Sequence, residues 1–124
     1  MKKKKIQNIL KNNHKKMLEN QIQKSILDYL AYKKNIYYFR AGSGSFKTEK
    51  GGYFKTGSKG CPDIVMSYHG QFVGLEVKTE KGKQSEYQKE AEKQIKKSGG
   101  FYYIVTSIDD VINCLKQIDN QLEI

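Results

Sequence analysis

The sequence predicts an α/β fold in which a mixed β-sheet is flanked by helices. Apolar residues recur with helical spacing in three stretches, and short β-rich runs lie between them. The unit that runs from a strand at 72–78 through a helix at 85–97 to a strand at 101–106 has the proportions of a right-handed parallel crossover. A chain of 124 residues has the length of one domain, so we expect a basic leader at 1–14 and a core at about 15–118.

The first helix is predicted at about 15–33, after a leader that we expect to fray. Its apolar stripe recurs every four residues and consists of Leu18, Ile22, Ile26 and Leu30. A β-rich run follows at 36–39. Residues 41–60 contain six of the eleven glycines, which predicts a long flexible loop or a loose hairpin.

Two further β-rich runs, at 64–68 and 72–78, flank a His-Gly pair that predicts a tight hairpin turn. With a two-residue loop, Tyr68 pairs with Gln71, and the same register places Asp63 directly across from Glu76. A three-residue loop without a bulge would put the two carboxylates on opposite faces, so this inference depends on loop length.

The second strand of this hairpin alternates between apolar and other residues. Its inward side is predicted to hold Val73, Leu75 and Val77, whereas Glu76 and Lys78 share the opposite face.

The last two helices are predicted from their caps. Ser85 is a typical N-cap, and the buried edge of its helix is expected to hold Tyr87, Ala91 and Ile95. Ser107, with Asp110 three residues on, resembles a capping box for the final helix.

The chain carries 23 Lys and Arg against 13 Asp and Glu, which gives a net charge of +10. Such a surplus favours polyanionic partners, of which nucleic acid is the commonest in a cell. In the glycine-rich stretch, aromatic residues are interleaved with Lys47, Lys50, Lys55 and Lys59, a pattern typical of a segment that follows a phosphate backbone. A general lysine bias that merely solvates the surface explains the charge equally well.

Several classes of protein are excluded by composition. No stretch approaches the roughly 20 apolar residues that cross a bilayer, so no membrane partner is expected. The two cysteines form no C-x-x-C pair and the two histidines are isolated, which argues against a disulfide framework or a structural zinc site. We therefore expect a cytoplasmic protein.

Opposed carboxylates at Asp63 and Glu76 repel each other unless a cation lies between them. Mg²⁺ prefers oxygen ligands and bridges carboxylates to substrate phosphates, with water in the remaining positions. Lys78, on the same face, would orient such a water and offset phosphate charge. These groups together suit phosphodiester hydrolysis.

Two outer residues have alternative interpretations. Glu19 shares the apolar edge of the first helix, where it would reach a metal or extend to solvent. Gln88 would hydrogen-bond the metal ligands or the phosphate, or it would only complete a capping box with Ser85. Glu76-Val77-Lys78 alone is also a common pattern of an amphipathic strand.

An ordered set of motifs resembles the PD-(D/E)xK nucleases, in particular the virus-type replication-repair nuclease (VRR-NUC) branch. The motifs are Gly57-x-x-Gly60-x-Pro62-Asp63, Glu76-x-Lys78, Gly82-Lys83, Ser85-x-x-Gln88 and Gly99-Gly100-Phe101-Tyr102. The resemblance covers about residues 14–112.

The resemblance implies a restriction-endonuclease-like fold and a nuclease that depends on Mg²⁺ or Mn²⁺. Its catalytic set would be Asp63, Glu76, Lys78, Glu19 and Gln88. Its metal ligands would be Asp63, Glu76, Glu19 and the backbone carbonyl of Val77, and Lys83 would join the DNA-contacting lysines. Stand-alone members of this size resemble phage or prophage proteins that form homodimers and act on branched DNA such as Holliday junctions or flaps. A non-catalytic nucleic-acid-binding protein, or a nuclease for RNA or plain duplex DNA, is the alternative.

Overall fold

The computed structural model describes residues 2–42, 44–47, 49–50, 53–56 and 59–124, without the side chains of 12–17, 44–47 and 53–56. Its elements follow one another as α1 (Lys2–Tyr32), β1 (Ile36–Arg40), β2 (Gly44–Lys47), β3 (Tyr53–Thr56), β4 (Ile64–Tyr68), β5 (Gln71–Val77), α2 (Glu86–Lys97), β6 (Phe101–Val105) and α3 (Ile108–Gln121). Across these described stretches, no helix has the length and apolar character needed to span a membrane.

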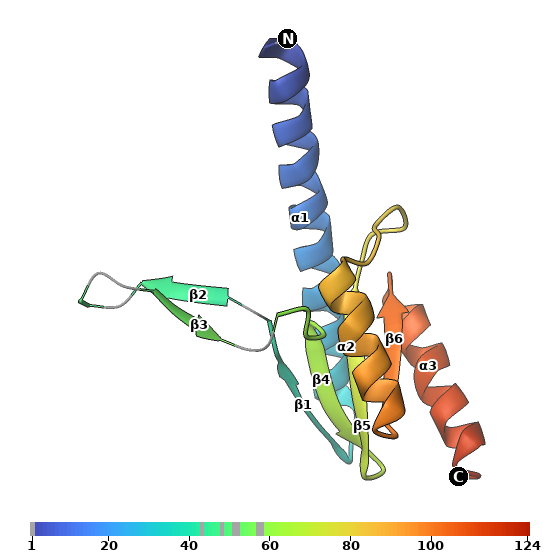
Figure 1. Ribbon diagram of the computed structural model, residues 1–124. Helices are drawn as coiled ribbons and strands as arrows, with labels where there is room; N and C mark the ends of the chain where they lie inside the picture. The colour runs from blue at the N-terminus through green and yellow to red at the C-terminus, as the bar shows by residue number, and fades with distance from the viewer. Residues whose placement is uncertain (1, 43, 48, 51–52, 57–58) are drawn as a thin grey trace.

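Four strands form the main sheet in the order β1-β4-β5-β6 (Figure 1). The β1–β4 and β4–β5 pairs are antiparallel, whereas β5 and β6 are parallel. The parallel pair is joined through α2, which is the crossover predicted from the sequence. The mixed sheet with flanking helices is confirmed.

The two faces of this sheet are covered differently. The principal core lies between one face and the helices α1 and α3, where Ile26 and Leu30 of α1 pack with Leu75 and with Ile118 of α3. The other face carries α2, whose Ile95 packs against Gly74. Because only one helix covers this second face, its cover is less complete.

The glycine-rich stretch forms the second alternative predicted for it, a hairpin. β2 and β3 pair antiparallel as a separate two-stranded sheet, and Figure 1 shows this hairpin extending away from the main sheet.

Helix α1 begins at Lys2, so the prediction of a frayed leader before residue 15 was wrong. The first 41 residues contain neither glycine nor proline, so nothing in the leader interrupts the helical backbone. In Figure 1 the first half of α1 extends beyond the sheet. Leu18 is accordingly 37% exposed, whereas Ile26 and Leu30 are fully buried.

Candidate active site

The two opposed carboxylates lie where the hairpin register predicts. β4 and β5 pair Tyr68 with Gln71 and Ile64 with Leu75, so the next rung sets Asp63 beside Glu76. The side chain of Asp63 also closes the end of this ladder, because its Oδ2 accepts a hydrogen bond of 2.8 Å from the backbone N–H of Val77. The prediction that both acids share one face is confirmed.

Glu76 is one of the least accessible side chains in the described chain, with 2% exposure. Its Oε1 accepts a hydrogen bond of 2.8 Å from Gln88 Nε2 and lies 3.8 Å from Lys78 Nζ. Its Oε2 is buried and has no hydrogen-bond partner. A buried carboxylate oxygen without a donor is costly, which marks this atom as a ligand position.

Burial raises the pKa of Glu76 from 4.5 to about 9, because a charged carboxylate is poorly solvated there. The neighbouring carboxylate of Asp63 raises the pKa of Glu76 further, and Glu19 adds a smaller effect in the same direction. Only Lys78 acts in the opposite direction. One lysine therefore does not offset the negative charge gathered at this point, and a divalent cation would.

Gln88 completes the predicted capping box and also hydrogen-bonds Glu76. Its Oε1 accepts a hydrogen bond of 2.8 Å from the backbone N–H of Ser85, and the backbone N–H of Gln88 donates to Ser85 Oγ. This capping box leaves the amide nitrogen directed at Glu76. The helix start therefore positions a donor for the buried acid.

Lys78 directly follows β5, and a backbone hydrogen bond fixes its position. Its N–H donates to the carbonyl of Val105, and its side chain is only 13% exposed. The ammonium group is thus kept beside Glu76 rather than extended into solvent, as the alternation of β5 predicts.

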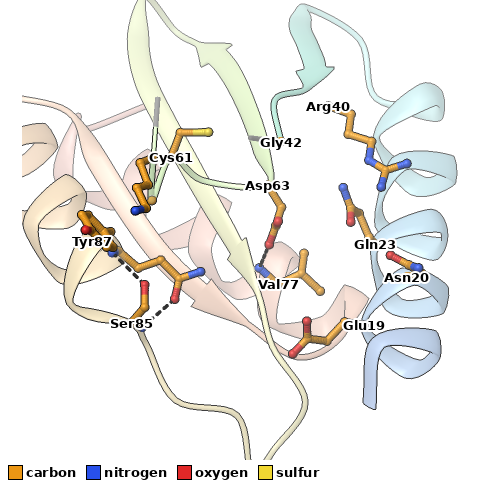
Figure 2. Close-up of a pocket in the computed structure, with 13 residues that line it drawn as sticks. Glu19, Asn20, Gln23, Arg40, Gly42, Cys61, Asp63, Val77, Ser85 and Tyr87 are labelled. Atoms are coloured by element: carbon orange, nitrogen blue, oxygen red, sulfur yellow. Dashed lines mark hydrogen bonds between the residues drawn. The ribbon is translucent and has the colours of Figure 1, made fainter. Parts of the chain in front are cut away.

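A pocket of about 410 Å³ opens at this end of the sheet, between α1 and α2 (Figure 2). Asp63 and Val77 form part of its wall, α2 contributes Gln88, and α1 contributes Glu19 from the opposite side. Glu19 is half-buried there and adds to the electrostatic environment of Glu76. The pocket thus brings the predicted Glu19 to the same space as the strand residues.

The donor set fits a hard divalent cation. Asp63 and the unsatisfied Oε2 of Glu76 supply carboxylate oxygens, and the carbonyl of Val77, the residue that follows Glu76, is a neutral oxygen. Within the described ranges, no three His, Cys, Asp or Glu side chains lie close enough together to hold one ion. Glu19 would accordingly act through water rather than as a third direct carboxylate.

The root of the β2–β3 hairpin borders this pocket and is fastened to α2. Lys59 Nζ lies 4.0 Å from the centre of the Tyr87 ring, a cation–π contact. Gly60 has φ of 81°, and a Cβ there would come within 2.4 Å of the backbone of Tyr87. Only glycine permits this approach. Tyr87 is 54% exposed, so its predicted place on the buried edge of α2 was wrong.

Among the other predicted DNA-contacting lysines, Lys50 and Lys83 do not line the pocket. Lys50 is exposed in the turn of the β2–β3 hairpin, and Lys83 is exposed in the loop that precedes α2. The predictions for Lys47 and Lys55 concern side chains outside the described residues.

One solved structure has a similar fold. It is described as a VRR_NUC domain protein, and it aligns with 82% of this chain and 88% of its own chain at 20% identity, with a TM-score of 0.55. The chain has a VRR-NUC-like fold. No protein-family model and no curated protein matches the sequence. The restriction-endonuclease-like architecture implied by the motifs is therefore confirmed at the level of the fold.

Three further residues of the VRR-NUC-like fold line the pocket and were not predicted from the sequence: Asn20, Gln23 and Arg40. Gln23 lies four residues after Glu19 and so shares its helix face, a spacing that was available in the sequence. Arg40 is the last residue of β1, and its neighbours in sequence give no sign that this strand ends at the acids.

Proposed function

We propose that this protein is a metal-dependent DNA endonuclease of the PD-(D/E)xK type that hydrolyses phosphodiester bonds in branched DNA. The observation that carries the proposal is the buried, unsatisfied Oε2 of Glu76 beside Asp63, with Lys78 Nζ 3.8 Å from the other oxygen of Glu76. The VRR-NUC-like fold supports the same conclusion. A net charge of +10 favours a polyanionic substrate.

Asp63 and Glu76 would hold Mg²⁺ or Mn²⁺, with the carbonyl of Val77 as a third oxygen ligand. When bound, the ion supplies Lewis acidity toward the phosphate and lowers the pKa of water. Asp63 is oriented for this task by the N–H of Val77, and Glu76 by the amide of Gln88. Both carboxylates are thus held in place before substrate binds.

Lys78 would position the attacking water and stabilise the charge that develops on the phosphate oxygens. Its ammonium group has three N–H donors. Its contact with Glu76, at 3.8 Å, is too long for a strong hydrogen bond, so the donors remain available to water and phosphate. Glu19, across the pocket, would hold a second water by accepting its hydrogen bond.

The DNA backbone would be gripped by Lys59 at the pocket rim and by Lys47, Lys50 and Lys55 on the hairpin, with Lys83 on the other side. Phosphate contacts of this kind position a substrate by its shape rather than its base sequence. Together with a homodimer, in which two sites face a symmetric junction, they favour Holliday junctions or flaps. We place this activity in the cytoplasm, as expected for a phage-type protein.

The test is a cleavage assay on labelled four-way junction, flap, nicked duplex, plain duplex, single-stranded DNA and RNA, each with Mg²⁺, Mn²⁺ or EDTA. Asp63→Asn is the inactivating variant, and Asp109→Asn, which removes an exposed carboxylate from α3, is the matched control. We expect metal-dependent cutting of branched DNA by the wild type and by Asp109→Asn, and none by Asp63→Asn.

Cutting that persists in Asp63→Asn would overturn the metal assignment. Binding without cutting under every metal condition would favour a non-catalytic nucleic-acid-binding protein. Preferential cutting of RNA or plain duplex DNA would support phosphodiester hydrolysis but would show that branched DNA is not the preferred substrate.

A further inference from the structure

The side of the pocket formed by α1 contains a polar group that the proposed chemistry does not use. Gln23 is only 7% exposed, yet its carboxamide makes no hydrogen bond within the described part of the chain. Figure 2 shows this side chain directed into the pocket, across from Ser85 and Tyr87. The amide therefore faces the open pocket rather than a protein partner, and its N–H groups are available to a ligand there.

Arg40 is held beside it by the sheet. The last rung of β1 pairs Arg40 with Ile64, and the next backbone N–H, that of Ala41, donates to the carbonyl of Asp63 at 2.8 Å. Arg40 is therefore anchored one residue from the position that faces Asp63. Its guanidinium is exposed, and no carboxylate among the described residues forms an ion pair with it.

The space next to these residues continues beyond the main pocket. A second recess of about 310 Å³ adjoins it, and Asn20, Gln23 and Arg40 line both. The two recesses form a path that leads from the buried acids along α1. A chain of phosphates bound at the acids would have room to continue there.

The donors along this path suit a phosphate. An arginine presents two parallel N–H groups that match two phosphate oxygens, and an amide NH₂ adds a third donor. Gln23 and Asn20 are neutral, so this part of the pocket lacks the negative charge that Asp63, Glu76 and Glu19 concentrate nearby.

We propose that Arg40 and Gln23 bind the backbone phosphate adjacent to the one that is cleaved. This inference rests on the proposed nuclease function for the identity of the ligand as DNA. Arg40 and Gln23 are positioning residues in this scheme: they set the register of the strand so that one phosphodiester lies at Asp63 and Glu76.

The test is DNA affinity as a function of salt, measured by fluorescence anisotropy in EDTA so that no cutting occurs. The variants are Arg40→Gln, Arg40→Lys and Gln23→Leu, on a labelled four-way junction and a duplex. Lys116→Gln is the matched control, because it removes one exposed charge from α3, which lines neither recess.

We expect Arg40→Gln to weaken binding about tenfold and to lower the slope of log K against log salt by about 0.9, as for one lost phosphate contact. Arg40→Lys should restore the slope but not the full affinity, because lysine lacks the paired donors. Gln23→Leu should weaken binding about threefold to tenfold with the slope unchanged, since the amide is neutral. Lys116→Gln should change neither.

An unchanged slope and affinity in Arg40→Gln, or a loss no greater than in Lys116→Gln, would overturn the subsite. With Mg²⁺, the same variant should raise KM about tenfold and leave kcat nearly unchanged, because the contact is equal in ground and transition states. If the wild type cuts nothing but Arg40→Gln still lowers the slope, the nuclease proposal fails and the phosphate site stands. If the wild type cuts and Arg40→Gln behaves like the wild type, the nuclease proposal stands and the phosphate site fails.

Discussion

Alternate residues of strand β5 lie on the two faces of the main sheet, so this one strand allows the two faces to be compared. On the side of α1 and α3, Val73, Leu75 and Val77 are buried among apolar side chains. On the side of α2, the alternate residue Glu76 is buried to the same degree but touches Gln88 and Lys78. Burial on the first face stabilises the fold, whereas burial of the Glu76 carboxyl group on the second face costs folding free energy. Substitutions on the first face should therefore mainly lower stability. Substitutions on the second face should mainly lower activity.

The largest effect is expected from Glu76→Gln, which replaces the ionisable carboxyl group on the second face by an amide of the same shape. Loss of a carboxyl group from the proposed metal site should reduce cleavage about 10³-fold or more, the scale for removing a central catalytic group. DNA affinity in EDTA should stay nearly equal, because burial keeps Glu76 largely uncharged at neutral pH in the wild type. Single-turnover cleavage beside anisotropy checks both; cleavage within tenfold of the wild type would contradict the assignment.

The same variant should also change how stability depends on pH when metal is removed. In the wild type, Glu76 has a pKa of about 9 when folded and an ordinary value when unfolded. Its favourable contribution is therefore complete below about pH 4.5 and is lost as pH rises toward about 9, with at most about 1.4 kcal/mol lost for each pH unit.

Urea unfolding in EDTA between pH 5 and pH 9 measures this difference. Wild-type stability should fall relative to that of Glu76→Gln as pH rises, and Mg²⁺ should reduce the difference by binding the charged form. Parallel curves in EDTA would show that Glu76 is not held neutral in the folded protein.

On the apolar face, Leu75→Ala should cost about 2–4 kcal/mol of unfolding free energy, because Leu75 is fully buried and truncation leaves a cavity. Cleavage per folded molecule should be nearly unchanged at low temperature. Denaturant unfolding provides the measurement, and a cost below about 1 kcal/mol would show that this face repacks freely.

A smaller effect is expected at the edge of the same core. Tyr68 donates a hydrogen bond of 2.6 Å from its hydroxyl to Asp119 on α3. Burial and this hydrogen bond raise the pKa of Tyr68 to about 12. Tyr68→Phe should cost about 1–2 kcal/mol because it leaves Asp119 without this donor. Thermal unfolding checks it, with no change in cleavage expected.

The smallest effect is expected from Lys50→Gln in the exposed turn of the β2–β3 hairpin. Stability should not change, and the salt slope of DNA binding should fall by about 0.9 if Lys50 contacts one phosphate. An unchanged slope would remove this turn from the path of the DNA.

The part of the site that sequence predicts is local. A two-residue turn sets the register of β4 and β5, and this register places Asp63 opposite Glu76. The Ser85-x-x-Gln88 spacing likewise starts α2 by itself. Both depend on backbone geometry within one continuous stretch of chain, residues 63–76 and 85–88, where local rules are strong.

What only the tertiary structure decided is which distant residues meet those acids. The capping box leaves the amide of Gln88 directed at Glu76 only because α2 packs on that face. Glu19 and Gln23 of α1, and Arg40 at the end of β1, reach the pocket through packing across many residues of chain. Sequence determined the opposed carboxylates and the start of α2 through short-range backbone geometry. Their surroundings, including the exposure of Tyr87 and the recesses along α1, depend on long-range contacts that no local spacing specifies.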